Sequence, residues 1–159
     1  MAGFVKVENL PIEHARLIFR NFKGEPDAVN PSGGVIKFGV IIDPEIYDID
    51  RLREVGWVIK ELKPKTEDGD SLYYLSVKVQ FGKGKDPDVK LICDNVSKNL
   101  REDTIGCLDT AELLNVDLVI HPYCWNVGEK SGVKAYLEIG YFTIKQNDPF
   151  AEKYAFLNS

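Results

Sequence analysis

The clearest hydrophobic pattern in the chain is a period-two alternation from Leu72 to Phe81. Apolar and aromatic residues occupy every odd-numbered position from 73 to 81, whereas the even-numbered positions carry Tyr74, Ser76, Lys78 and Gln80. Successive side chains of a β-strand point to opposite faces, so this segment is predicted to be a half-buried strand. Its odd-numbered face belongs to the core, and its even-numbered face is available to solvent or to a ligand.

Other apolar or alternating stretches, bounded by Gly, Pro, Asn and Asp, predict about six more strands. They cover residues 15–22, 35–42, 57–62, 89–93, 116–127 and 133–144, and the last two form a long hairpin around a turn at 128–132. This tally, with no βαβ repeat, favours an antiparallel barrel or sandwich over a doubly wound fold.

One main helix is predicted from Asp43 to Val55. Asp43 can cap it, and Pro44 suits its first position. Apolar residues follow at helical spacing (Ile46, Ile49, Leu52 and Val55), and Gly56 ends the run. A short helical turn is also expected at residues 109–114.

Length and composition indicate one globular domain over residues 1–146, followed by an appended segment at 147–159. Phe150, Tyr154 and Phe156 are expected to pack that segment down as a helical turn. No apolar run approaches the roughly 20 residues of a membrane helix, and residues 1–6 do not resemble a secretory signal. We therefore expect a cytoplasmic protein without a membrane partner.

Candidate catalytic groups are few. Cys93, Cys107 and Cys124 lie far apart in apolar segments, which is typical of buried reduced thiols. No metal-binding spacing of Cys and His occurs, and no phosphate-binding loop is present. His121 and Cys124 are three residues apart on a predicted strand and would face opposite sides. We expect no metal, no cofactor and a binding protein rather than an enzyme.

The net charge of −5 argues mildly against a nucleic-acid partner. The distribution of the charges argues the other way. Proteins that hold single strands without reading their sequence combine cations with aromatic rings on which bases stack. Three clusters do so: Arg16, Phe19, Arg20, Phe22 and Lys23; Tyr74, Lys78, Lys83, Lys85 and Lys90; and Tyr123, Trp125, Lys130, Lys134 and Tyr136.

Each cluster also has a purely structural interpretation. Strict alternation places Phe22 on the face of Arg16 and Arg20, with Phe19 on the opposite face. Tyr74 and Lys78 share a face that either binds a ligand or is simply solvated. Tyr123 and Trp125 share a face of the hairpin, opposite Cys124, and one of those two faces is expected to be core.

The hairpin also carries a family resemblance. Its first strand ends in Tyr123-x-Trp125, and Gly132-Val133-x-Ala135-x-Leu137 follows the Gly128 turn. Together with the early runs 16–19 and 38–42, this resembles tailed-bacteriophage single-stranded-DNA-binding proteins with an OB fold. The resemblance implies an OB barrel that coats single-stranded DNA during phage replication or recombination. Members often have an acidic C-terminal tail that recruits partners, whereas residues 147–159 contain only Asp148 and Glu152 as acids.

The sequence thus predicts a mainly β protein, an OB-fold-like antiparallel β-barrel with extra strands and one main helix. The predicted function is sequence-tolerant binding of single-stranded DNA, with replication or recombination proteins as further partners and a homodimer left open. The alternative is a protein–protein interaction module, such as a phage structural or host-inhibitor protein. The predicted nucleic-acid-binding residues are Arg16, Arg20, Phe22, Lys23, Tyr74, Lys78, Lys83, Lys85, Lys90, Tyr123, Trp125 and Lys134.

Overall fold

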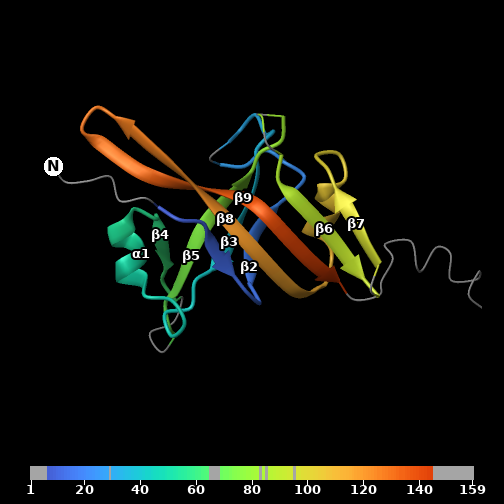
Figure 1. The fold of residues 1–159 in the computed structure, drawn as a ribbon, viewed down its shortest axis with the longest axis horizontal. Helices are drawn as coiled ribbons and strands as arrows, with labels where there is room; N and C mark the ends of the chain where they lie inside the picture. The colour runs from blue at the N-terminus through green and yellow to red at the C-terminus, as the bar shows by residue number, and fades with distance from the viewer. Residues whose placement is uncertain are drawn as a thin grey trace, which may run out of the picture.

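A computed structural model describes residues 7–28, 30–64, 69–82, 84, 86–94 and 96–144. In this part of the chain nine strands form one mixed sheet with a single α-helix and a short 3-10 helix (Figure 1). The elements are β1 (Leu10–Ile12), β2 (Leu17–Asn21), β3 (Ile36–Ile41), α1 (Ile49–Val55), β4 (Ile59–Leu62), β5 (Leu72–Val79), β6 (Asp88–Cys93), β7 (Val96–Leu100), η1 (Ile105–Asp109), β8 (Leu113–Val127) and β9 (Lys130–Ile144). The expectation of a mainly β protein is confirmed.

The sheet is ordered β1-β8-β9-β5-β3-β2, with β4 added to β5 and the β6–β7 pair added to β9. β9 therefore joins the two halves of the molecule. Its pairings with β5 and β6 are parallel, so the prediction of a wholly antiparallel sheet is wrong there. Several elements separate β5 and β6 from β9 along the chain, so the chain has room to return in the same direction. A tight hairpin, by contrast, can join only antiparallel strands.

The two ends of this path, β1 and β2, are consecutive along the chain, and no ladder joins them. Ala15, which lies between them, donates its backbone N–H to the Val116 carbonyl at 2.7 Å. The Arg16 carbonyl accepts from the Ile41 N–H at 2.9 Å. The link between β1 and β2 thus bonds to β8 on one side and to the end of β3 on the other.

The core forms on the face that the alternation predicted. Leu75, Val77 and Val79 of β5 are buried, which confirms the odd-numbered core face. At its centre the Phe22 ring stacks on Phe38, with 5.2 Å between centroids, and meets Phe142 edge-on at 5.8 Å. These large side chains fix the spacing between β2, β3 and β9, and thereby the shape of the outer face.

The main helix is shorter than the sequence indicated. It spans Ile49–Val55, and Asp48 rather than Asp43 is its N-cap. The Asp43 carboxylate instead accepts a backbone N–H two residues on, which makes a separate turn, and Ile46 is left 72% exposed. Both Asp43 and Asp48 can cap a helix, but only Asp48 directly precedes the residues whose apolar side chains pack on the core. The helix ends at Gly56, as predicted.

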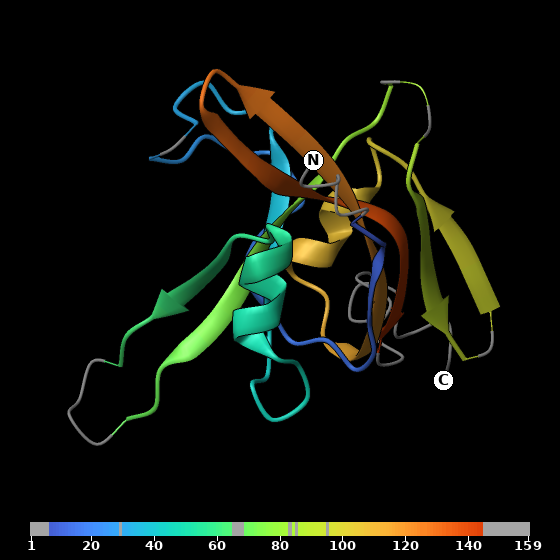
Figure 2. The same ribbon diagram turned by 60° about the vertical axis from the view of Figure 1, so that its left-hand side comes forward.

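Two further segments differ from expectation. The helical turn predicted at 109–114 is wrong, because η1 ends at Asp109 and β8 already begins at Leu113. β7 was not predicted as a strand, since four of its five residues are exposed and carry no alternation. Figures 1 and 2 agree in placing β6 and β7 on the side of the molecule away from α1 and β4.

The predicted helical turn in 147–159 lies outside the described residues, as do Lys83 and Lys85. Within the described residues, no helix is long and apolar enough to cross a membrane.

Candidate nucleic-acid interface

A groove of about 620 Å³ lies over the outer face of β3 and β5, beside β2 and the loop that follows it. We call it the Tyr74 groove. Its charged and aromatic lining residues are Phe19, Arg20, Lys23, Glu25, Asp27, Lys37, Phe38, Lys60, Tyr74 and Asp109. The even-numbered face of β5, which the sequence left open between ligand binding and solvation, supplies Tyr74 and Ser76 to this groove.

Cross-strand register extends this face from the groove to the hairpin. Lys78 of β5 lies opposite Lys37 of β3 on one side and beside Tyr136 of β9 on the other. Tyr136 in turn lies opposite His121 of β8. Paired residues of neighbouring strands point to the same face of a sheet, so these four side chains form one row across the sheet.

Tyr74 is held in place by its neighbours. Its ring meets the Phe19 ring edge-on, with 5.5 Å between centroids and 69° between planes. Gly39 on β3 leaves room beneath it, since a Cβ there would lie 2.9 Å from the Ile18 side chain and 3.4 Å from the Tyr74 ring. Lys60 of β4 lies opposite Tyr74 on its other side. The ring is thus fixed on the outer face with a cation on an adjacent strand.

The predicted assignment of β2 side chains to the two faces of the sheet is wrong for the residues after Ile18. Ile18 pairs with Gly39 and Asn21 with Lys37, so β2 has one more residue than β3 between these pairs, a β-bulge. The bulge reverses the alternation: Phe22 is 1% exposed and lies in the core, whereas Phe19 is 59% exposed and faces the groove. Phe22 therefore cannot stack on a base, and the alternation had assigned the two rings to the wrong faces.

The predicted cations of the first cluster have different environments. The Arg20 guanidinium donates to the carbonyls of Leu108 and Ala111, both at 2.9 Å, so it ties β2 to the connection before β8. The Lys23 side chain is exposed at the groove. Arg16 is exposed but lines hollows beside the β1–β2 link rather than the Tyr74 groove.

The acids of the groove are largely occupied by the protein itself. Asp27 forms an ion pair with Lys37 at 2.8 Å. The Asp109 carboxylate accepts the backbone N–H groups of Phe22 at 2.7 Å and Lys23 at 3.0 Å. Charge on these two carboxylates is therefore partly compensated, and the exposed cations Lys23 and Lys60 set the local potential together with Lys78 nearby.

The predicted hairpin is confirmed. β8 and β9 pair over their whole length and turn at Gly128, whose φ of +63° suits a glycine. Figure 1 shows its tip projecting beyond the rest of the sheet. The expectation that one face is core fails at this tip, because Tyr123 is 56% exposed on one face while Cys124 is exposed on the other. The core face resumes at Val133 and Ala135.

The aromatic residues of the β8–β9 arm lie on the face of the Lys78–Tyr136 row. Tyr123 meets Tyr136 edge-on at 6.0 Å and lies opposite Lys134. The Trp125 indole lies over Gly132, where a Cβ would come within 3.0 Å of the ring. The partly exposed Tyr74 ring and the aromatic residues of the arm therefore share one face, and lysines lie between them.

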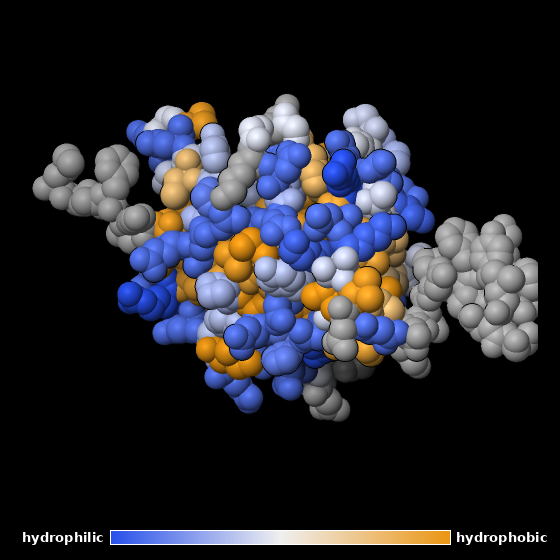
Figure 3. All heavy atoms as spheres, turned by 45° about the vertical axis from the view of Figure 1, so that its right-hand side comes forward, coloured by the Kyte–Doolittle hydropathy of each residue, from blue (hydrophilic) through white to orange (hydrophobic). Residues whose placement is uncertain are grey.

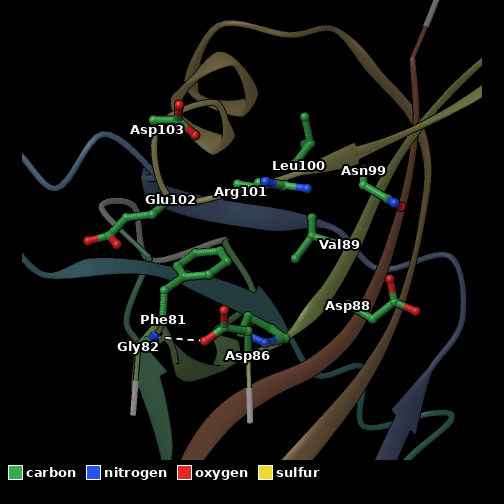
Figure 4. A pocket seen from close by; sticks show the side chains of 11 residues that line it. Phe81, Gly82, Asp86, Asp88, Val89, Asn99, Leu100, Arg101, Glu102 and Asp103 are labelled. Carbon is green, nitrogen blue, oxygen red and sulfur yellow. Dashed lines mark hydrogen bonds between the residues drawn. The ribbon is translucent and has the colours of Figure 1, made fainter. Parts of the chain in front are cut away.

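Lys90 does not line the Tyr74 groove. It lies on β6, 3.6 Å from an Asp88 carboxylate oxygen and 3.1 Å from the Asn99 amide oxygen. β6 and β7 border a second hollow of about 810 Å³, which we call the acidic hollow (Figure 4). Its charged lining residues are Asp86, Asp88, Arg101, Glu102 and Asp103. Figure 3 brings the β6–β7 side forward and shows a mostly hydrophilic surface with separate apolar patches.

The thiols differ in their surroundings. Cys124 is exposed, so the expectation that all three cysteines are buried is wrong, while Cys93 and Cys107 are half-buried. Burial raises the pKa of the Cys107 thiol, and Lys98 partly opposes that shift. A raised pKa keeps this thiol protonated and unreactive at neutral pH. Among the described residues, no group of three or more His, Cys, Asp or Glu side chains is placed to hold a metal ion.

Burial likewise raises the pKa of the Tyr47 phenol, which lies beside Glu13 near α1 and outside the Tyr74 groove.

Comparison with known proteins identifies the family of the chain. The family model described as "Putative phage ssDNA-binding domain" matches residues 2–158. The chain belongs to this family. A phage ssDNA-binding domain agrees with the function that the interleaved cations and rings predicted. Among curated proteins, nothing matches.

Solved structures of a bacteriophage Enc34 protein have a similar fold. The single-stranded DNA-binding protein of bacteriophage Enc34 is similar with a TM-score of 0.54 and 13% identity over 87% of each chain in its C-terminally truncated form. The same protein in complex with ssDNA has a TM-score of 0.55 and 14% identity over 89% of each chain. A protein of bacteriophage T7, the single-stranded DNA-binding protein gp2.5, has a TM-score of 0.38 with 14% identity over 92% of this chain and 94% of its own.

Two cations and one exposed ring of the Tyr74 groove were not among the predicted site residues. Lys37 and Lys60 are single cations within or beside otherwise apolar runs, Val35–Ile42 and Trp57–Ile59, and that isolation was a usable signal. Phe19 was missed because strict alternation places it opposite the arginines. Only the bulge brings it to the groove, and no local pattern in the sequence indicates a bulge at that point.

Proposed function

We propose that this protein binds single-stranded DNA without sequence preference along the face formed by the Tyr74 groove, the Lys37–Lys78–Tyr136 row and the β8–β9 arm. The observation that carries the proposal is the continuity of this face. The exposed ring of Tyr123 and the partly exposed rings of Tyr74 and Trp125 alternate with lysines on paired strands. Rings stack on any base and lysines follow the phosphates, so this arrangement tolerates any sequence.

We further propose that the sheet is an OB-type barrel with added strands. If β1 and β2 are one interrupted strand, the path β1/β2-β3-β5-β9-β8 returns to its start, since the linking residues bond to both β8 and the end of β3. OB folds bind oligonucleotides on the face of their second and third strands and with the loops after the first and fourth. Here these are β3 and β5, residues 22–35, and the tip of the arm.

The similarity to the Enc34 protein supports this proposal through its fold, and that protein has been solved with ssDNA bound. Replication or recombination of phage-type DNA is the role that we assign, with proteins of those processes as further partners and the host cytoplasm as the site of action. We assign the protein a binding role without catalysis of its own.

Titration with labelled oligomers tests the proposal. We expect tight binding to a dT oligomer, little binding to a duplex of the same length, and a steep loss of affinity as salt is raised, because bound phosphates release counterions. A parallel titration with rU determines the preference between DNA and RNA. Absence of binding to a long dT oligomer even at low salt would refute the proposal.

A further inference from the structure

Phe19 has an unusual backbone conformation. Its φ is +51°, in the left-handed region that bulky side chains rarely enter, because the Cβ approaches the following carbonyl oxygen. The side chain gains little burial in return, since 59% of it is exposed. A large apolar residue that is both strained and exposed is not explained by the stability of the fold, and such outliers cluster at ligand sites.

The strained conformation is held by contacts on the C-terminal side of Phe19. The Arg20 guanidinium bonds to two carbonyl oxygens near η1, at 2.9 Å each. The Asp109 carboxylate accepts two successive N–H groups, from Phe22 and Lys23. Phe22 then enters the core against Phe38. These four hydrogen bonds and one buried ring fix the chain after the bulge, so Phe19 has little freedom to relax.

The bulge thereby directs the Phe19 ring into the Tyr74 groove. The two rings stand at 69° to each other with centroids 5.5 Å apart, which makes a corner with two aromatic walls. Lys23 and Lys60 also line the groove. A base that stacks on one wall meets the other wall at its edge, and its phosphates lie within the field of these cations.

We propose that Phe19 is a base-stacking residue and that the β2 bulge exists to present it. The proposal rests on the proposed function and adds to it a specific residue and a specific contact, with the nucleobase rather than the backbone. It also implies that the protein gives up some stability at this position for the sake of the ligand.

The variant Phe19→Gly tests both parts. Glycine adopts a positive φ without strain, so the bulge is kept while the ring is lost. We expect the Kd for a dT oligomer to rise about tenfold, as for the loss of stacking on one base. Binding to an abasic oligomer of the same length should be unchanged, because that oligomer has no base to stack. The thermal midpoint should stay the same or rise.

Two matched variants accompany it. Phe19→Tyr keeps a ring at the position and should bind the dT oligomer as the wild type does. Val96→Ala shortens another exposed apolar side chain, on β7 and outside the groove, and should leave both titrations unchanged.

The results separate this inference from the proposed function. If the wild type binds the dT oligomer and Phe19→Gly binds it equally well, Phe19 does not stack on a base, although the proposed function stands. An equal loss on the dT and abasic oligomers would overturn the stacking contact. A clear fall in the thermal midpoint of Phe19→Gly would show that the ring serves packing. If the wild type binds no oligomer, the proposed function itself fails.

Discussion

The Tyr74 groove and the acidic hollow are two depressions of similar size on one small protein. The groove is lined by three aromatic residues, Phe19, Phe38 and Tyr74, and the hollow by one, Phe81, and each is bordered by charged side chains. The groove has four basic and three acidic residues, and two of those acids are engaged within the protein. The hollow has one basic and four acidic residues. The acidic hollow is the larger, at about 810 Å³ against about 620 Å³.

This difference explains how a protein with a net charge of −5 can bind a polyanion. Volume does not mark the groove as the binding site, whereas the sign of the local charge and the number of aromatic rings in the lining do. Phosphate is attracted only where the potential is positive over about one Debye length, roughly 8 Å at physiological salt. An acidic surface elsewhere repels DNA, which agrees with the single path that we propose. Total charge is therefore a poor guide to the ligand.

Reversing the charge of the groove should have the largest effect. In the double variant Lys60→Glu/Lys78→Glu, two attractive interactions become repulsive, and we expect the affinity for a dT oligomer at low salt to fall by about a hundredfold or more. The slope of log K against log salt should flatten by about 1.4, at about 0.7 for each phosphate that a lysine no longer neutralises. An unchanged slope would mean that neither lysine meets a phosphate. Circular dichroism provides the control for folding.

Removing the ring of the groove should have the next largest effect. Tyr74→Ala is expected to weaken binding about tenfold with little change in the salt slope, because stacking is worth roughly 1–3 kcal/mol per base and involves no charge. Tyr141→Ala is the matched control, since Tyr141 is 38% exposed on β9 but pairs with Lys90 of β6, on the β6–β7 side. If the two variants lose equal affinity, the groove has no special role.

The arm should contribute less. Trp125→Ala removes a partly exposed indole whose one face already lies over Gly132, and we expect a loss of about threefold to tenfold. The effect should appear with long oligomers and disappear with oligomers too short to reach from Tyr74 to the arm. Val127→Ala, at the tip and 72% exposed, is the control. A loss that does not depend on oligomer length would mean that the indole does not act by contacting the far part of a long oligomer.

Changing the acidic hollow should have the smallest effect. Glu102→Lys/Asp103→Lys reverses two charges there, and we expect about a twofold gain in affinity at low salt that vanishes at high salt, since it acts only through the long-range field. A large gain that survives high salt would mean that the strand passes through the hollow. That result would break the distinction between the two depressions.

Local patterns predicted the parts of this fold that depend on local chemistry. The alternation of 72–81 identified β5 and its core face, and the paired runs around Gly128 identified the hairpin. Periodicity carries no information about which distant strands become neighbours, so the parallel pairings of β9 could not be predicted. Helix capping was ambiguous because Asp43 and Asp48 both suit the role.

The candidate site was also predicted only in part, because local patterns identify some of its residues and distant packing decides the others. Tyr74, Lys78, Tyr123 and Trp125, which the structure places on one face, were predicted as site residues because each interleaves with cations or alternates with core residues. Phe22 was wrong because one inserted residue in β2 turns every later side chain to the other face. The sequence allows a bulge there but does not require one. The outcome depends on how the Phe22 ring packs with Phe38 and Phe142, which come from other strands of the sheet.

The central position of β9 has a consequence for how the protein is made. β9 hydrogen-bonds to β8, β5 and β6, and it is the last of the described strands to be synthesised. The first strand, β1, likewise waits for β8, since Leu10 pairs with Ile120. Until residues 130–144 emerge from the ribosome, the two halves of the sheet share no strand and only the short link between β1 and β2 bonds to both. Such distant pairings fold slowly, so the nascent chain should need protection from aggregation until synthesis is nearly complete.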